Sequence, residues 1–236
     1  MNNSIKLSPR LTAAASFARR GSFVADVGTD HAYLPIYLCE QKLVRGAVAS
    51  DVNLGPVERA KNHIRAYGLA KSISVEHCDG LDGLEKYSPD DIFILGMGGE
   101  LIVSLLARAP WITTQGNPRR LVLQPMTHPE TVRAYLLENS FSIVDEILVE
   151  DDKIYQIICA EYSQGGEKYP QNNVSLYFGA KNIERGGELL HSLLSHWVDI
   201  LSVRIEGKKK GAGADTSFEE ALLSEIETVL QKEKKQ

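Results

Sequence analysis

The sequence predicts an α/β fold in which a doubly wound, mostly parallel sheet is followed by a small helical domain. Short apolar strands alternate with helix-forming segments through the first part of the chain, as in repeated strand-helix-strand units. Two β-rich runs then follow each other directly and predict an antiparallel hairpin at the edge of the sheet. The remainder contains amphipathic helices and no predicted strand.

The first helix is predicted over 7–20, because Ser8 can cap it and Pro9 fits its first turn. The strand 23–27 ends at Gly28, where the chain turns into a helix. The other predicted strands are 47–51, 73–77, 91–95 and 121–123, and the helices between strands begin near Asp30 or His31 and near Pro56, Glu100 and Glu130.

The predicted hairpin pairs 141–149 with 153–161 across an acidic tip. Composition shifts to Gly, Gln and Lys around 163–171, so we expect two domains, 1–164 and 165–236. In the second, apolar residues at helical spacing predict helices over 188–205 and 218–230. A Gly- and Lys-rich turn over 207–213 would join them into a helical hairpin or coiled coil.

Composition excludes several classes of protein. The chain has 236 residues, a net charge of −5 and no apolar run of the roughly 18 residues that a membrane-spanning helix needs. The N-terminus lacks the apolar core of a signal peptide, and three widely separated cysteines have no metal-ligand spacing. We therefore expect a cytoplasmic protein with reduced thiols and without a metal, a monomer being favoured.

The turn at Gly28 is the first candidate binding site. A single glycine without a Cβ lets the backbone approach a ligand, but the turn is not the GxGxxG of dinucleotide sites. The carboxylates of Asp26 and Asp30 would repel a pyrophosphate, yet they can accept hydrogen bonds from an amino group or pair with a cation. This combination favours S-adenosylmethionine, and the alternative is a plain turn without a ligand.

Acids and glycines recur at the ends of the following strands. Asp51 is placed to bind ribose hydroxyls, or else is a solvated strand end. Asp79 can accept from an adenine amine, or form a turn with Gly80; the two roles are compatible. Gly96-Met97-Gly98-Gly99 either lets a flat group lie against backbone or only allows tight helix packing.

Basic residues gather near both ends of the chain, although the net charge is negative. They predict contacts with nucleic-acid phosphates, the alternative being solvated ends: Arg10, Arg19, Arg20, Lys208, Lys209 and Lys210. Gln124, which precedes Pro125, should point into the crevice of a parallel sheet. Motifs of hydrolases, NTPases and zinc sites are absent from the sequence.

Three strings together resemble the bacterial tRNA (adenine-N1)-methyltransferase family that modifies adenine 22. They are Asp26-Val27-Gly28-Thr29-Asp30-His31-Ala32-Tyr33-Leu34-Pro35, Gly96-Met97-Gly98-Gly99 and Leu123-Gln124-Pro125. The resemblance implies a Rossmann-like class I methyltransferase domain, followed by a helical coiled-coil domain. It also implies that Asp30, His31 and Tyr33 border the methyl-transfer site. The cofactor would then lie against Asp26, Gly28, Asp51, Asp79, Gly80, Gly96 and Gly98.

Two residues depart from the pattern of that family. Asp51 stands where relatives often have Glu, which still suits a ribose, and Met126 stands where many have Asn. The resemblance implies methylation of adenine N1 in tRNA with S-adenosylmethionine. The alternatives are a methyltransferase of small molecules or proteins, with the helical hairpin as a dimerisation device, and a non-catalytic nucleotide- or RNA-binding module.

Overall fold

The computed structural model describes residues 5–114, 119–163, 169–210 and 214–233. The chain begins with α1 (Pro9–Ala15), β1 (Phe23–Val27), α2 (Tyr33–Glu40), β2 (Gly46–Asp51), α3 (Leu54–Ala66) and β3 (Ile73–His77). It continues with η1 (Leu84–Tyr87), β4 (Asp91–Met97), α4 (Gly99–Ala107), η2 (Pro110–Thr113), β5 (Arg120–Pro125), α5 (Pro129–Glu138), β6 (Phe141–Glu150) and β7 (Ile154–Tyr162). The C-terminal helices are α6 (Asn173–Phe178), α7 (Ala180–Arg185), α8 (Glu188–Lys210) and α9 (Ser217–Glu233).

Within the described residues, seven strands form one sheet in the order β3-β2-β1-β4-β5-β7-β6. Strands β1 to β5 are parallel, and β7 is antiparallel to both of its neighbours. The predicted parallel sheet with an antiparallel hairpin is therefore confirmed. Within this hairpin β7 pairs with β5, and β6 forms the edge of the sheet.

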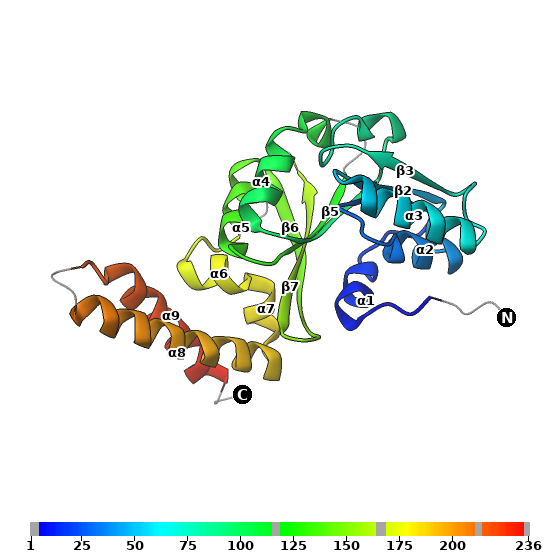
Figure 1. The fold of residues 1–236 in the computed structure, drawn as a ribbon. Helices are drawn as coiled ribbons and strands as arrows, with labels where there is room; N and C mark the ends of the chain where they lie inside the picture. Colours follow the sequence, from blue (N-terminus) through cyan, green and yellow to red (C-terminus); the bar gives the residue numbers. More distant parts are fainter. Residues whose placement is uncertain (1–4, 115–118, 164–168, 211–213, 234–236) are drawn as a thin grey trace.

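Helices cover both faces of the sheet (Figure 1). Successive strand side chains point to opposite faces, so a strand buried on both sides is apolar throughout. In β1, Val24 packs into the layer that contains Leu34 and Ile64, whereas Ala25 packs into the layer that contains Ile102. This arrangement explains why Val24, Ala25 and Val27 of β1 are all buried, and the strand ends where the Gly28 turn begins.

Several predicted helix boundaries are wrong. Helix α1 ends at Ala15 instead of Arg20, and α2 starts only at Tyr33, because Ala32 takes a left-handed conformation with φ of 55°. The segment from Gly207 to Lys210, predicted as a turn, is the last turn of α8. A helix tolerates one glycine at a cost of about 1 kcal/mol, and the lysines after it are good helix formers. Residues 211–213 of that predicted turn lie outside the described residues.

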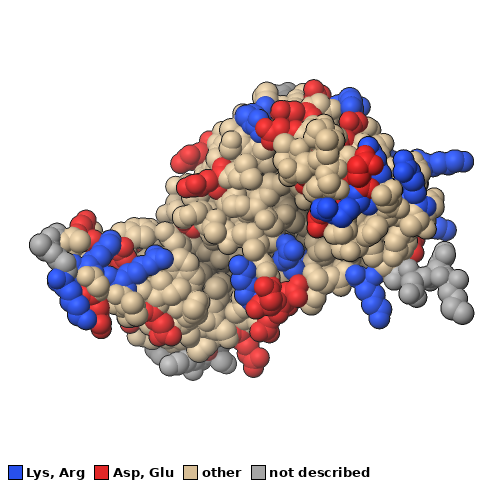
Figure 2. Space-filling model, in the orientation of Figure 1, with Lys and Arg blue, Asp and Glu red and all other residues tan. Residues whose placement is uncertain are grey.

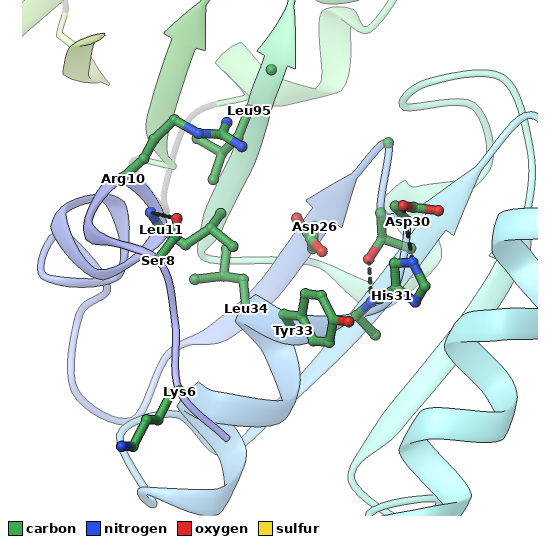
Figure 3. Close-up of a pocket in the computed structure, with 14 residues that line it drawn as sticks. Lys6, Ser8, Arg10, Leu11, Asp26, Asp30, His31, Tyr33, Leu34 and Leu95 are labelled. Atoms are coloured by element: carbon green, nitrogen blue, oxygen red, sulfur yellow. Dashed lines mark hydrogen bonds and ion pairs between the residues drawn. The ribbon is translucent and has the colours of Figure 1, made fainter. Parts of the chain in front are cut away.

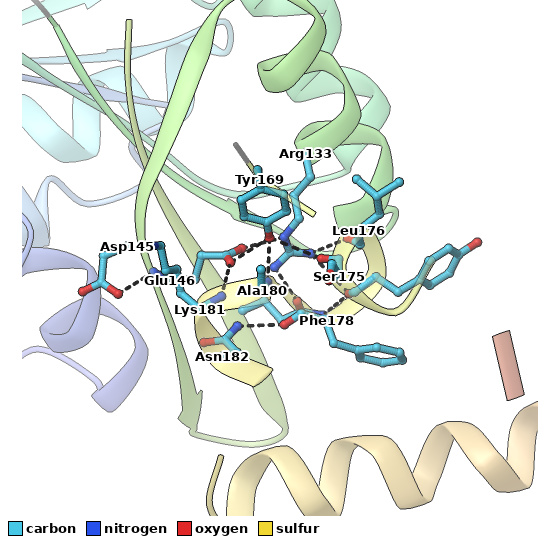
Figure 4. Close-up of polar contacts among 12 residues, drawn as sticks. Arg133, Asp145, Glu146, Tyr169, Ser175, Leu176, Phe178, Ala180, Lys181 and Asn182 are labelled. Carbon is cyan, nitrogen blue, oxygen red and sulfur yellow. Dashed lines mark hydrogen bonds and ion pairs between the residues drawn. The ribbon is translucent and has the colours of Figure 1, made fainter. Parts of the chain in front are cut away.

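The helices α6 and α7, which the sequence analysis does not predict, are fastened to the sheet by a buried ion pair (Figure 4). Arg133 of α5 and Glu146 of β6 are wholly buried and lie 2.6 Å apart. The Arg133 guanidinium also donates to the backbone oxygen of Leu176, at 2.8 Å, and to Gln156. Tyr169 donates its hydroxyl to Glu146 at 2.9 Å. A buried charge is tolerated only with such partners, so the network fixes where α6 lies against the sheet.

Helices α8 and α9 form the predicted hairpin, which projects away from the sheet (Figure 1). Their apolar stripes share one core with α6, including Phe178, Leu194, Leu222 and Ile226. Leu148 of β6 packs against the same core. The division into domains at 164 and 165 falls among residues outside the described part of the chain and stays a prediction.

Candidate active site

A cavity of about 650 Å³ lies at the carboxyl edge of the sheet (Figure 3). Its walls come from the segment before α1 and α1 itself, the turn after β1, the start of α2 and the end of β4. The residues that line the cavity include Arg10, Asp26, Gly28, Asp30, His31, Tyr33 and Gly96. Ligands of doubly wound sheets bind in the crevice outside the carboxyl ends of the strands, so the cavity lies where the fold class predicts it.

The glycine turn is held over the end of β2. The backbone N–H groups of Gly28 and Thr29 both donate to the Ser50 oxygen, each at 2.8 Å. Gly28 has φ of 78°, a conformation that favours glycine. Thr29 Oγ1 accepts from the Ala32 N–H at 3.1 Å, which closes the loop before α2 begins. The turn therefore brings bare backbone to the cavity wall.

Asp26 lies at the end of β1 and points into this cavity (Figure 3). Its side chain is buried, and burial raises its pKa from 3.8 to about 6, with the Asp51 carboxylate adding to the rise and a hydrogen bond from Thr29 opposing it. A buried carboxylate without a cationic partner is costly. A ligand with a positive charge would remove this cost.

The predicted residues Asp30, His31 and Tyr33 come together on one wall. Asp30 pairs with the Arg59 guanidinium at 2.5 Å and with His31 Nε2 at 3.1 Å. The rings of His31 and Tyr33 are stacked, with centroids 5.1 Å apart, and His63 packs beside both. Arg59 and His63 lie on α3, and nothing in their local sequence signals this contact.

His31 and Tyr33 differ in their exposure. His31 Nδ1 is buried and has no hydrogen-bond partner within the described residues. Tyr33 is 41% exposed at the mouth of the cavity. Its stacking on His31 leaves the side chain available at the rim.

Asp51 and Asp79 continue the crevice along the strand ends but do not line the cavity itself. Asp51 accepts from the Asn53 backbone N–H at 2.7 Å, and its own backbone oxygen accepts from the Cys78 N–H. This pairing brings the loop with Asp79 next to Asp51. The Arg108 guanidinium, 3.0 Å away, lowers the pKa of Asp79. An adenine amine would therefore share this carboxylate with Arg108.

The glycines of the crevice serve different purposes. Gly96 forms a bulge in β4, has φ of 80° and lines the cavity. Gly80 has φ of 61°, and a Cβ there would approach a Leu105 methyl to 2.4 Å. Gly98 is the N-terminal cap of α4, and Gly99 packs directly on the backbone of Thr127 and His128. The packing alternative therefore describes Gly99, whereas Gly96 is open to a ligand.

Gln124 is fully buried, and its predicted contact with tRNA stays a prediction. Its amide oxygen accepts from Arg10 Nη1 at 2.6 Å. The end of β5 therefore orients Arg10, which itself lines the cavity.

Most of the other basic residues predicted to bind tRNA form ion pairs with carboxylates in the structure. Arg19 is not a free cation, because it binds the buried Asp91 carboxylate at 2.6 Å. It lies before the amino end of β1, so the five residues of that strand, about 16 Å, separate it from the crevice. The exposed Arg20 lies beside it. Lys208, Lys209 and Lys210 pair with Glu219, Glu220 and Glu206 respectively.

Among the described residues, no group of three or more histidines, cysteines or acidic residues is arranged to hold a metal ion. The described helices also include none that is long and apolar enough to cross a membrane. The three cysteines are free.

The sheet order, the acid at the end of β1 and the glycine turn define a Rossmann-like methyltransferase of class I. A family model described as a methyltransferase domain matches residues 7–158.

Relatives define the family more closely. The tRNA (adenine(22)-N1)-methyltransferase of Bacillus subtilis is 36% identical over 178 residues, which cover 75% of this chain and 73% of that protein. The crystal structure of the B. subtilis m1A22 tRNA methyltransferase TrmK is 30% identical, has a TM-score of 0.78 and covers 98% of both chains. Sp1610 of Streptococcus pneumoniae, solved with S-adenosyl-L-methionine, is 30% identical with a TM-score of 0.84, covering 95% of this chain and all of that one.

The chain belongs to the tRNA (adenine(22)-N1)-methyltransferase family. The family predicted from the three sequence strings is confirmed.

Proposed function

We propose that the chain transfers a methyl group from S-adenosylmethionine to N1 of adenine 22 in tRNA. The observation that carries this function is the cavity at the Gly28 turn, in a chain of this family. The Asp26 carboxylate is buried there, and no Lys or Arg of the described residues forms an ion pair with it. A tRNA substrate supports a reaction in the cytoplasm, which is part of this proposal.

The residues present fit this cofactor. The ammonium of its methionine part suits the Asp26 carboxylate, whose raised pKa reflects an uncompensated buried charge. The open backbone at Gly28 and Gly96 leaves room for the nucleoside, whose ribose hydroxyls suit Asp51 and whose adenine amine suits Asp79. When bound, S-adenosylmethionine supplies a methyl group activated by the sulfonium.

The substrate adenine demands little proton chemistry from the protein. N1 carries a lone pair in the plane of the ring, so no strong base is needed and alignment is the main task. Because N1 lies on the Watson–Crick edge, the base must be unpaired or flipped into the cavity.

Asp30 is the residue suited to the charge that develops on the methylated ring. Its carboxylate is oriented by Arg59 and His31 and remains 62% exposed, so it can accept from the adenine amine and stabilise the cationic product. The exposed ring of Tyr33 is suited to stack on the base, and His31 to hydrogen-bond it.

Transfer of tritium from labelled cofactor to unmodified tRNA tests the proposal. We expect labelling at adenine 22, and a protein that binds the cofactor but labels no tRNA would refute the substrate. Two variants separate the roles of the acids. Asp30→Ala should lower kcat about 100-fold with little change in cofactor Kd, whereas Asp51→Ala should mainly raise that Kd. If Asp30→Ala lowers the affinity for the cofactor as much as it lowers kcat, Asp30 is a cofactor ligand instead.

A further inference from the structure

A second cavity, of about 390 Å³, lies between the carboxyl edge of the sheet and the C-terminal helices. The loop after β5, the start of β7 and helices α6 and α8 line it, and the residues that matter here are Met126, His128, Lys153, Tyr177, Trp197 and Arg204. In Figure 2 the α8–α9 hairpin projects from the body of the molecule, and the surface is recessed where the two meet. We call this cavity the β5–α8 groove.

The groove is next to the active-site cavity, because a side chain that lines one contacts a side chain that lines the other. Arg10 lines the first cavity, and its guanidinium lies over the ring of Tyr155, which lines the groove, at 5.2 Å. Gln124, which orients Arg10, also donates to the Pro125 oxygen at 3.1 Å, where the groove begins. An RNA strand whose base enters the active-site cavity would therefore lie beside the groove.

The charges of the groove suit a polyanion. Lys153 and Arg204 are exposed, and neither has a carboxylate partner within ion-pair distance among the described residues. The lysines at the end of α8, in contrast, are already paired with glutamates. Glu130 is the acidic residue of the described lining, and it contacts His128 at 3.0 Å. Arg204 and Lys153 are therefore better placed to bind phosphate than the lysines of the Gly-Lys segment.

The aromatic side chains of the groove suit a base. Trp197 is half-buried and meets Tyr177 edge-on, with ring centroids 5.4 Å apart. Phe178 holds the same indole from behind, with centroids 5.6 Å apart, so the ring is fixed in its place. Aromatic platforms flanked by cations are the means by which proteins bind unstacked RNA strands.

We propose that the β5–α8 groove binds a nucleotide of the tRNA next to the flipped adenosine, with Arg204 and Lys153 on its phosphates and Trp197 against its base. The inference rests on the proposed function and adds a binding site to it. It gives the helical hairpin a direct contact with the strand that carries the target base.

Charge removal tests the phosphate contacts. Arg204→Ala and Lys153→Ala should each raise the Kd for tRNA about fivefold and together about 25-fold, each lowering the slope of log Kd against log salt by about 1. Arg65→Ala on α3 is the control, because Arg65 is also exposed, hydrogen-bonds Asn62 and does not line the groove. Cofactor Kd should be unchanged in all of them. If the wild type methylates tRNA but the groove variants bind tRNA as tightly as the control does, the groove is not a tRNA-binding site. The proposed function would then still hold.

Fluorescence tests the base contact, because the chain has two tryptophans. Trp111→Phe leaves Trp197 as the reporter in the groove, and Trp197→Phe leaves Trp111, which lies under Arg119 away from it. Unmodified tRNA should quench the first protein at least twofold more than the second. Equal quenching, or none in a protein that methylates tRNA, would overturn the assignment of Trp197. A wild type that neither binds nor methylates tRNA would overturn both the groove and the function.

Discussion

Replacing Asp26 by Asn should stabilise the protein without cofactor at neutral pH. The folded chain holds the Asp26 proton with a pKa of about 6, against an ordinary value of 3.8. Stability therefore falls as the pH rises from 3.8 to 6, because the folded state must give up a proton that it binds more tightly than the unfolded chain. At 1.36 kcal/mol per pH unit, the full loss above pH 6 is about 3 kcal/mol.

Urea unfolding of both proteins measures this difference. At pH 7.5 the Asp26→Asn protein should be more stable by about 3 kcal/mol, or about 6–10 °C in Tm, whereas at pH 4 most of the gain should disappear. Asp151→Asn, at the exposed tip of the β6–β7 hairpin, is the control and should change stability by less than about 0.5 kcal/mol. An equal gain at the two pH values, or none at pH 7.5, would refute the burial argument.

The same substitution should weaken binding of the cofactor, because the buried side chain no longer carries a negative charge. We expect the Kd for S-adenosylmethionine to rise about 30-fold or more at pH 7. In the wild type, affinity should increase about fivefold between pH 5 and pH 6 and level off above pH 7, since binding needs the ionised form. Calorimetry in buffers of different ionisation enthalpy would report the released proton. A pH-independent Kd would show that Asp26 does not face the ammonium.

Two further substitutions test how the site is supported. Arg133→Met should destabilise the protein by about 3–5 kcal/mol in urea unfolding, because Glu146 stays buried without its partner. The double variant Arg133→Met with Glu146→Leu should recover most of this loss. Equal losses in the single and double variants would show that the two side chains are not coupled. Gly99→Ala should cost about 3 kcal/mol, since its methyl would lie 2.3 Å from the His128 backbone oxygen, which cannot move aside as a side chain can. Gly28→Ala meets only the flexible end of Met97, so thermal unfolding should show a smaller cost, about 1–2 kcal/mol from its left-handed backbone; a reversed order would contradict this account.

The middle of the sheet can be predicted from the sequence because strands such as β1, β2 and β5 are buried on both faces. Strands β1 and β3 have the predicted bounds, because turn-forming residues follow each of them: Gly28 after β1, and Asp79 and Gly80 soon after β3. Helices α6 and α7 escape prediction because each has six residues and depends on buried contacts with Tyr169, Arg133 and Glu146. Such short helices have little intrinsic stability, so their sequence carries almost no periodic signal.

The acids of the candidate site can also be predicted, because each ends a strand at the same edge of the sheet. Their partners cannot. Arg59 reaches Asp30 from α3, Arg108 reaches Asp79 from α4, and Arg10 reaches Gln124 across most of the catalytic part of the chain. Contacts of this kind depend on how helices pack on the sheet, which no local pattern specifies.

The buried network around Arg133 and Glu146 has a consequence for exchanging parts between relatives. A cut between 164 and 165 would separate Arg133 from Leu176 and Glu146 from Tyr169, and so leave two charges without their neutral partners. Gly186 and Gly187, both with positive φ, come after the last helix that touches this network and before α8. A chimaera that exchanges only the α8–α9 hairpin is better joined at these glycines, where the backbone tolerates many conformations. The Arg133–Glu146 ion pair then keeps its hydrogen bonds to Leu176 and Tyr169.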